Sequence, residues 1–124
     1  MRFIVLVKAS KDSEAGVLPT AEMLAEMGAF NDQLTKAGIM LAGEGLQPTS
    51  KGARIKFASE KPTVIDGPFA ETKELVAGFW MLQARSKEEI VEWMSRAPFT
   101  EAELEIRQIY ELEDFAPVLN AKSK

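Results

Sequence analysis

Two short apolar runs, Phe3–Val7 and Phe79–Leu82, carry hydrophobic side chains at both odd and even positions. Successive side chains of a strand point to opposite faces of its sheet, so these runs predict central strands that are covered on both faces. A layer of helices covers one face of a sheet. The other face needs cover of its own, and we expect a homodimer in which the sheets of two copies pack together.

A first amphipathic helix is predicted to begin near Pro19 or Thr20 and to end at Gly38. Apolar residues recur there every three or four positions, which places them on the face of a helix that covers the sheet. The residues that we expect to be buried on this face are Met23, Leu24, Met27, Phe30 and Leu34.

A second helix is indicated by Ser86–Glu89, which has the spacing of a capping box. The serine oxygen can accept from the amide three residues later, and Pro98 stops the helix near Ala97. The residues that we expect to be buried on this helix are Ile90, Val91 and Met94.

The remaining strands are predicted from segments that are rich in β-branched and aromatic residues. Strands are predicted at Arg2–Lys8, Ile39–Leu46, Val76–Gln83 and Glu103–Leu112, a hairpin at 54–65 with its turn at 59–62, and a polar loop at 9–17. Phe79 and Trp80 alternate along their strand, so one should meet the helices and the other a partner chain or a pocket.

The order of these elements is that of a split βαβ repeat with an inserted hairpin. It predicts the α+β class, with a ferredoxin-like βαβ-ββ-βαβ protomer that occupies residues 1–118 as a single domain. Residues 119–124 are predicted to form a polar C-terminal tail.

Composition excludes several classes of function. Fifteen basic residues are scattered among nineteen acidic ones, so nucleic acid is not an expected partner. The chain has no cysteine and no histidine, which removes thiolate chemistry, histidine-based triads and histidine metal sites; no metal and no cofactor are predicted. The N-terminal apolar run is too short for a signal peptide or a membrane span, so the cytoplasm is the expected location.

The segment Asp66–Glu74, with the sequence DGPFAETKE, resembles the signature of the DGPF-type proteins of the YCII-related family at nine consecutive positions. Gly78–Trp80 after it, Gly43–Pro48 before it and Glu105–Arg107 further on also resemble that family. The resemblance therefore spans most of the chain.

The resemblance implies a dimeric α/β barrel built from ferredoxin-like protomers. The activity of the group is largely unassigned, and some relatives are linked with extracytoplasmic-function sigma factors. The YCII proteins proper are suspected of using a His-Asp pair in a cleft. This chain contains no histidine and departs from that pattern.

Asp66 is the candidate catalytic residue, because it lies where a strand gives way to Gly67–Pro68. One interpretation is structural: the carboxylate accepts hydrogen bonds from the backbone of the turn that follows. A second is functional: Asp66 lies at the mouth of a pocket, where desolvation raises its pKa and lets it act as a general base. A third combines both roles.

Three further residues are candidate ligand-binding residues. Glu44 lies between two glycines that leave room for a ligand, and Lys73 and Arg107 could pair with the acids or bind an anion, Arg107 through its bidentate fork. Surface salt bridges are the alternative role for each of them.

Two functions remain open from the sequence. The first is a small cytoplasmic protein that binds or transforms a small molecule in a pocket near Asp66. The second is a non-catalytic interaction or regulatory protein, linked to extracytoplasmic-function sigma factor systems. Whether the chain is an enzyme is also left open.

Overall fold

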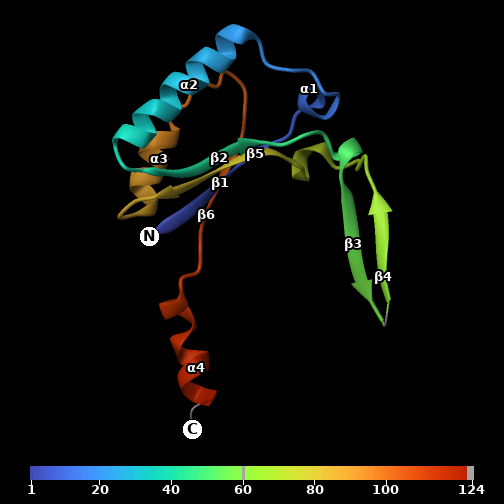
Figure 1. Ribbon diagram of the computed structural model, residues 1–124, viewed down its shortest axis with the longest axis vertical. Coiled ribbons are helices and arrows are strands. Elements are labelled where there is room, and N and C mark those ends of the chain that lie inside the picture. The colour runs from blue at the N-terminus through green and yellow to red at the C-terminus, as the bar shows by residue number, and fades with distance from the viewer. Residues whose placement is uncertain (60, 123–124) are drawn as a thin grey trace.

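The computed structural model describes residues 1–59 and 61–122, with side chains up to residue 120. Its main sheet has the order β2-β5-β1-β6, and all neighbouring strands are antiparallel (Figure 1). The strands are β1 (Arg2–Lys8), β2 (Met40–Gly45), β5 (Val76–Gln83) and β6 (Leu104–Gln108). The predicted α+β class with an antiparallel sheet is confirmed, and the strand order is that of a split βαβ arrangement.

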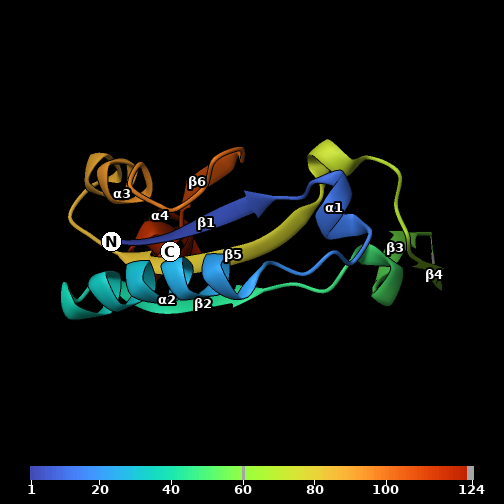
Figure 2. The ribbon, with the colours of Figure 1, turned by 90° about the horizontal axis from the view of Figure 1, so that it is seen from above.

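Helices α2 (Ala21–Lys36) and α3 (Lys87–Met94) lie on the same face of this sheet, α2 over β2 and α3 over β6, as Figure 2 shows from above. α3 begins at its predicted cap, and α2 begins next to Thr20, where the sequence predicted its start. Thr20 Oγ1 accepts from the Met23 amide at 3.1 Å, and Ser86 Oγ accepts from the Glu89 amide at 3.2 Å. These bonds satisfy amides that have no partner within the helix, which is why the two helices start where they do.

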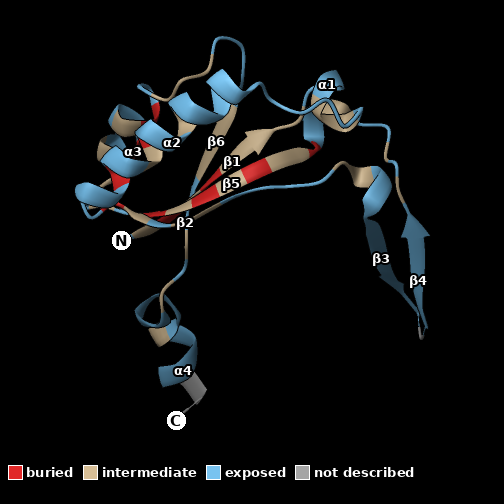
Figure 3. Cartoon of the chain, turned by 45° about the horizontal axis from the view of Figure 1, so that its top comes forward, coloured by how far each residue is buried: buried red, intermediate tan, exposed pale blue. Residues whose placement is uncertain are grey.

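The core lies between the two helices and the sheet, where buried residues line the central strands (Figure 3). Burial of an aliphatic or aromatic side chain stabilises a fold by about 1.5–3 kcal/mol, so this cluster contributes strongly to the stability of the fold. Its members are Phe3, Val5, Phe30, Leu34, Ile39, Trp80, Leu82, Ile90 and Met94.

Three helical residues that the pattern predicted to be buried are exposed. Met23 and Leu24 are 56% and 59% exposed, and Val91 is also exposed. The part of α2 that meets the core begins at Met27, so the first turn of the helix has no core residue to cover.

The last strand is shorter than predicted. β6 ends at Gln108, opposite Phe3, and after it only the Ile109 amide still bonds to β1, at the carbonyl oxygen of its first residue, Arg2 (2.9 Å). Tyr110 and Leu112, which the predicted strand included, lie beyond it and are exposed.

The predicted hairpin is confirmed as β3 (Ala53–Ala58) and β4 (Lys61–Asp66). One residue of its predicted turn, Glu60, lies outside the described residues. The predicted polar loop holds a single helical turn, α1 (Lys11–Glu14), because Ser10 and Ser13 cap each other's backbone amides. Two short 3-10 helices flank the hairpin, η1 (Thr49–Lys51) and η2 (Thr72–Glu74).

The C-terminal residues form η3 (Leu112–Phe115) and α4 (Ala116–Lys122), so α4 crosses the expected domain end at residue 118. The last two residues of the expected tail, 123 and 124, lie outside the described residues. Arg2 attaches this segment to the sheet, since its Nε and Nη2 donate to the Glu111 carboxylate at 2.8 and 2.9 Å. These hydrogen bonds lower the pKa of the Glu111 carboxyl.

The face of the sheet opposite the helices is apolar and open. Ile4, Leu6, Phe79 and Met81 alternate with the core residues of β1 and β5 and are half-buried. The hairpin and α4 both project from the sheet on this side (Figure 1). The chain exposes 9420 Å², whereas a compact monomer of 124 residues exposes about 6,600 Å².

None of the helices in the described part of the chain has the length and the apolar run that crossing a bilayer requires.

Candidate functional site

A cavity of about 210 Å³ lies between α2 and the strands β2 and β5. Asn31 of α2, Glu44 of β2, Trp80 of β5 and the loop residue Phe99 are among the residues that line it. Trp80 Nε1 donates to Asn31 Oδ1 at 2.9 Å, which fixes the indole against the helix. The Trp80 ring also packs edge-on against Phe99, with 6.2 Å between the ring centroids.

Three glycines shape the cavity. A Cβ at Gly43 would lie 2.8 Å from Trp80 Cδ1, so the indole can lie flat against β2 only because Gly43 has no side chain. A Cβ at Gly78 would lie 3.0 Å from the Glu44 carbonyl oxygen. A Cβ at Gly45 would meet no atom within 4 Å, so the space next to Glu44 is open.

One polar side chain, Asn31, enters this mostly apolar space. The Asn31 amide oxygen is occupied by Trp80, which leaves the amide NH₂ group as a donor. Glu44 lies opposite Phe79 in the register of β2 and β5, so its exposed side chain points to the open face of the sheet and away from the cavity. The cavity therefore presents one donor beside aromatic walls.

The four candidate residues from the sequence are not brought together. Glu44 lines the cavity. Lys73 lines a neighbouring groove of about 890 Å³, which shares Val7, Ala77 and Phe99 with the cavity. Asp66 lies exposed at the end of β4 and lines neither space. The roles proposed for these side chains stay predictions.

Arg107 also lies apart from the cavity, on the exposed side of β6. Its Nη1 is 3.4 Å from Glu105 Oε2, and Lys8 Nζ is 3.1 Å from Glu105 Oε1. The hydrogen bond from Lys8, more than that from Arg107, lowers the pKa of the Glu105 carboxyl. Exposed pairs of this kind stabilise a fold little.

The segment Asp66–Glu74 packs at the base of the hairpin, where it meets α1 and η1. The Glu14 carboxylate accepts from the Thr49 amide at 3.1 Å and from Thr49 Oγ1 at 2.6 Å, and the Phe69 amide donates to Thr49 Oγ1 at 3.1 Å. The Arg54 guanidinium lies 3.8 Å above the Phe69 ring. We call this set of contacts the Thr49 junction.

Hydrogen bonding at this turn thus comes from Thr49. No described residue donates a hydrogen bond to the Asp66 carboxylate, so the capping interpretation of Asp66 has no contact to support it in this chain.

Sequence reasoning missed Asn31, Thr49 and Glu14. Asn31 had a signal, because it lies four residues after Met27 and so interrupts the apolar face of α2 with an amide. Glu14 and Thr49 are 35 residues apart, and polar residues in two separate loops carry no periodic pattern that would pair them.

A family model described as "YCII-related domain" matches residues 1–113 of the chain. A curated protein from Rhizobium meliloti (strain 1021), "Uncharacterized protein R00369", is 30% identical over 71 residues, which are 57% of this chain and 57% of that protein. The match thus spans little more than half of the curated relative.

Among solved structures, the chain is similar to 5-chloro-2-hydroxyhydroquinone dehydrochlorinase from Burkholderia phenoliruptrix AC1100, in complex with 2,5-dihydroxybenzoquinone. The identity is 16% and the TM-score 0.46, with 92% of this chain and 99% of the other covered.

Proposed function

The chain belongs to the YCII-related family, and from this premise we propose that it binds a small molecule in the cavity between α2 and the sheet. The observation that carries the proposal is the Asn31 amide donor, held by Trp80 in an otherwise apolar cavity that Phe99 also lines. Ligand sites are commonly apolar cavities with a few placed polar groups. In this proposal Asn31, and not Asp66, contacts the ligand.

The size and chemistry of the cavity define a class of ligand. An apolar cavity of about 150 Å³ accommodates benzene, so about 210 Å³ holds one six-membered ring with one or two small substituents. A hydroxyl or carbonyl oxygen on the ring would accept an Asn31 amide hydrogen. Trp80 and Phe99 favour a planar ring, because offset and edge-on aromatic contacts are stabilising.

We also propose that the working unit is a homodimer, in the form of the dimeric α/β barrel expected from the sequence. The chain exposes roughly 2,800 Å² more than a compact monomer of its length. A standard interface takes about 800 Å² from each partner. The open apolar face of β1 and β5 is the surface that the dimer would cover.

The ligand proposal is tested by filling the cavity. In the register of β2, Gly45 faces the same side as Gly43, whose neighbour across the strand is Trp80. Gly45→Leu should therefore occupy the cavity without a backbone clash and abolish the rise in melting temperature that single-ring phenols or anilines give the unchanged protein. A ligand at 100 times its Kd stabilises the fold by about 2.7 kcal/mol, a shift that thermal denaturation resolves.

Gly28→Leu is the matched control, because a Cβ at Gly28 also meets no atom within 4 Å and Gly28 lies on the exposed side of α2. This variant should keep the ligand response. Asn31→Asp should weaken binding about tenfold, because the carboxylate still accepts from Trp80 Nε1 but no longer donates a hydrogen bond to the ligand. Undiminished binding by Gly45→Leu would rule out the cavity as the site.

A further inference from the structure

The hairpin β3–β4 is exposed along both strands. The cross-strand register puts Ile55 opposite Val64 on one face, together with Phe57, which is 80% exposed. Lys56, opposite Thr63, lies on the other face with Lys61. A two-stranded hairpin alone in water is marginally stable, so this apolar face needs a partner.

The C-terminal segment, residues 110–120, is a second exposed surface. Tyr110, Leu112, Phe115 and Val118 are all exposed there. This segment is acidic beside its apolar residues, since it carries Glu113 and Asp114 in η3. Glu111 holds this segment to the sheet through Arg2, but the apolar side chains of the segment stay exposed. These side chains also need a partner.

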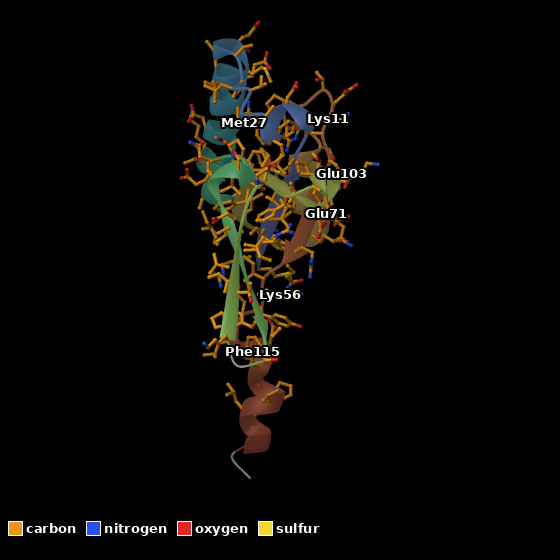
Figure 4. All side chains as sticks on the ribbon, turned by 90° about the vertical axis from the view of Figure 1, so that its right-hand side faces the viewer. Lys11, Met27, Lys56, Glu71, Glu103 and Phe115 are labelled. Atoms are coloured by element: carbon orange, nitrogen blue, oxygen red, sulfur yellow. The ribbon has the colours of Figure 1, made fainter. Side chains whose placement is uncertain are left out.

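Both surfaces lie on the same side of the sheet. In Figure 4, Lys56 on the hairpin and Phe115 on the C-terminal segment lie on one side of the sheet, and Met27 of α2 lies on the other. Figure 1 shows the two elements as separate projections of one chain, with the open apolar face of the sheet above them. A second copy that covers this face would meet both projections.

We propose that the hairpin of one copy packs against the C-terminal segment of the second copy, and the reverse, in a dimer that encloses the open sheet face. The inference rests on the proposed homodimer and goes beyond it. A two-fold axis makes both contacts by one rotation, because residue i then meets residue j and j meets i. The excess exposed surface of roughly 2,800 Å² per chain is large enough for two such contacts as well as the sheet face.

Charge disfavours the pairing of two C-terminal segments, because it would bring Glu113 and Asp114 of both copies together. Like charges in close contact disfavour a complex. A hairpin against a C-terminal segment avoids this repulsion and covers apolar residues of both elements.

The absence of cysteine from the chain allows a clean cross-linking test. One chain carries Phe57→Cys and a second, differently tagged chain carries Val118→Cys. The two are co-expressed, treated with a short bis-maleimide and separated on a denaturing gel. The mixed pair should give a covalent dimer that contains both tags. Leu24→Cys paired with Val118→Cys is the control, because Leu24 is also exposed but lies on α2, on the far side of the sheet.

The native mass of each sample is measured alongside. Two results would contradict the exchange but not the homodimer. In one, chains that carry only Phe57→Cys cross-link to each other; in the other, the mixed pair is dimeric but does not cross-link. A monomeric mass would overturn both the homodimer and the exchange, while the ligand response of the cavity is scored separately in the thermal assay.

Discussion

Trp80→Ala should lower the free energy of unfolding by about 3–5 kcal/mol, the usual cost of truncating a large buried aromatic side chain. Trp80 is 5% exposed and packs edge-on against Phe30 and Phe99, with centroid distances of 6.1 and 6.2 Å. The variant also leaves the Asn31 amide oxygen without its donor. Since natural domains are stable by about 5–15 kcal/mol, this one change removes a large part of the total.

Trp93→Ala is the matched control, because it deletes the same side chain from a half-buried position under the Arg96 guanidinium. We expect it to cost about 1 kcal/mol, close to the average for a point mutation. Urea denaturation followed by circular dichroism measures both variants. Equal losses in the two would contradict the placement of Trp80 at the centre of the core.

Gly67→Ala should destabilise the protein by about 1–3 kcal/mol or more, the cost of overpacking a close contact. A Cβ at Gly67 would overlap the carbonyl oxygen and carbon of Thr49, and these are backbone atoms that cannot rotate away. The chain must shift, and the shift breaks the bond between the Phe69 amide and Thr49 Oγ1. Hydrogen exchange should therefore speed up at the base of the hairpin.

Two nearby changes serve as controls for Gly67→Ala. At Gly52 the nearest atom to an added Cβ is the Thr49 oxygen at 3.6 Å, an ordinary contact, so Gly52→Ala should be nearly neutral. Asp66→Asn keeps the shape of a side chain that lies exposed outside both cavities, and should change stability by no more than about 0.5 kcal/mol. If Gly67→Ala behaved like these two, the Thr49 junction would have no structural importance.

Local signals account for what could be predicted of the fold. The caps at Thr20 and Ser86 involve residues three apart, and the alternation of Trp80 with Phe79 follows from the pleat of a strand. Such features depend on neighbours along the chain, so the sequence displays them directly. Trp80 is buried under the helices and Phe79 faces the open side of the sheet, as the alternation predicts.

Features that depend on distant residues could not be predicted. The end of β6 is set by where β1 begins, about a hundred residues earlier, and the apolar residues Tyr110 and Leu112 continue the strand pattern past that point. The exposure of Leu24 likewise depends on how far the core extends under α2.

The candidate site was predicted only in part, for the same reason. The glycines on both sides of Glu44 indicated space for a ligand, and the structure places a cavity there. Asp66 was proposed as a site residue because it is a carboxylate within the DGPFAETKE motif. In the structure that motif packs against Thr49, which in turn bonds to Glu14, and both residues come from other segments of the chain. Only the folded chain reveals that the motif builds the base of the hairpin and that Asn31 lines the cavity beside Trp80.

The central claim is that the cavity beside Trp80 binds a single-ring ligand, and the two tryptophans of the chain allow a direct measurement. Each indole N–H gives its own nitrogen–proton NMR signal, and Trp93→Phe identifies which is which. On titration with a phenol or aniline, the Trp80 signal should move, because its N–H lies in the cavity wall against Asn31, while the Trp93 signal stays in place. Movement of the Trp93 signal with Trp80 unchanged would contradict the proposed site.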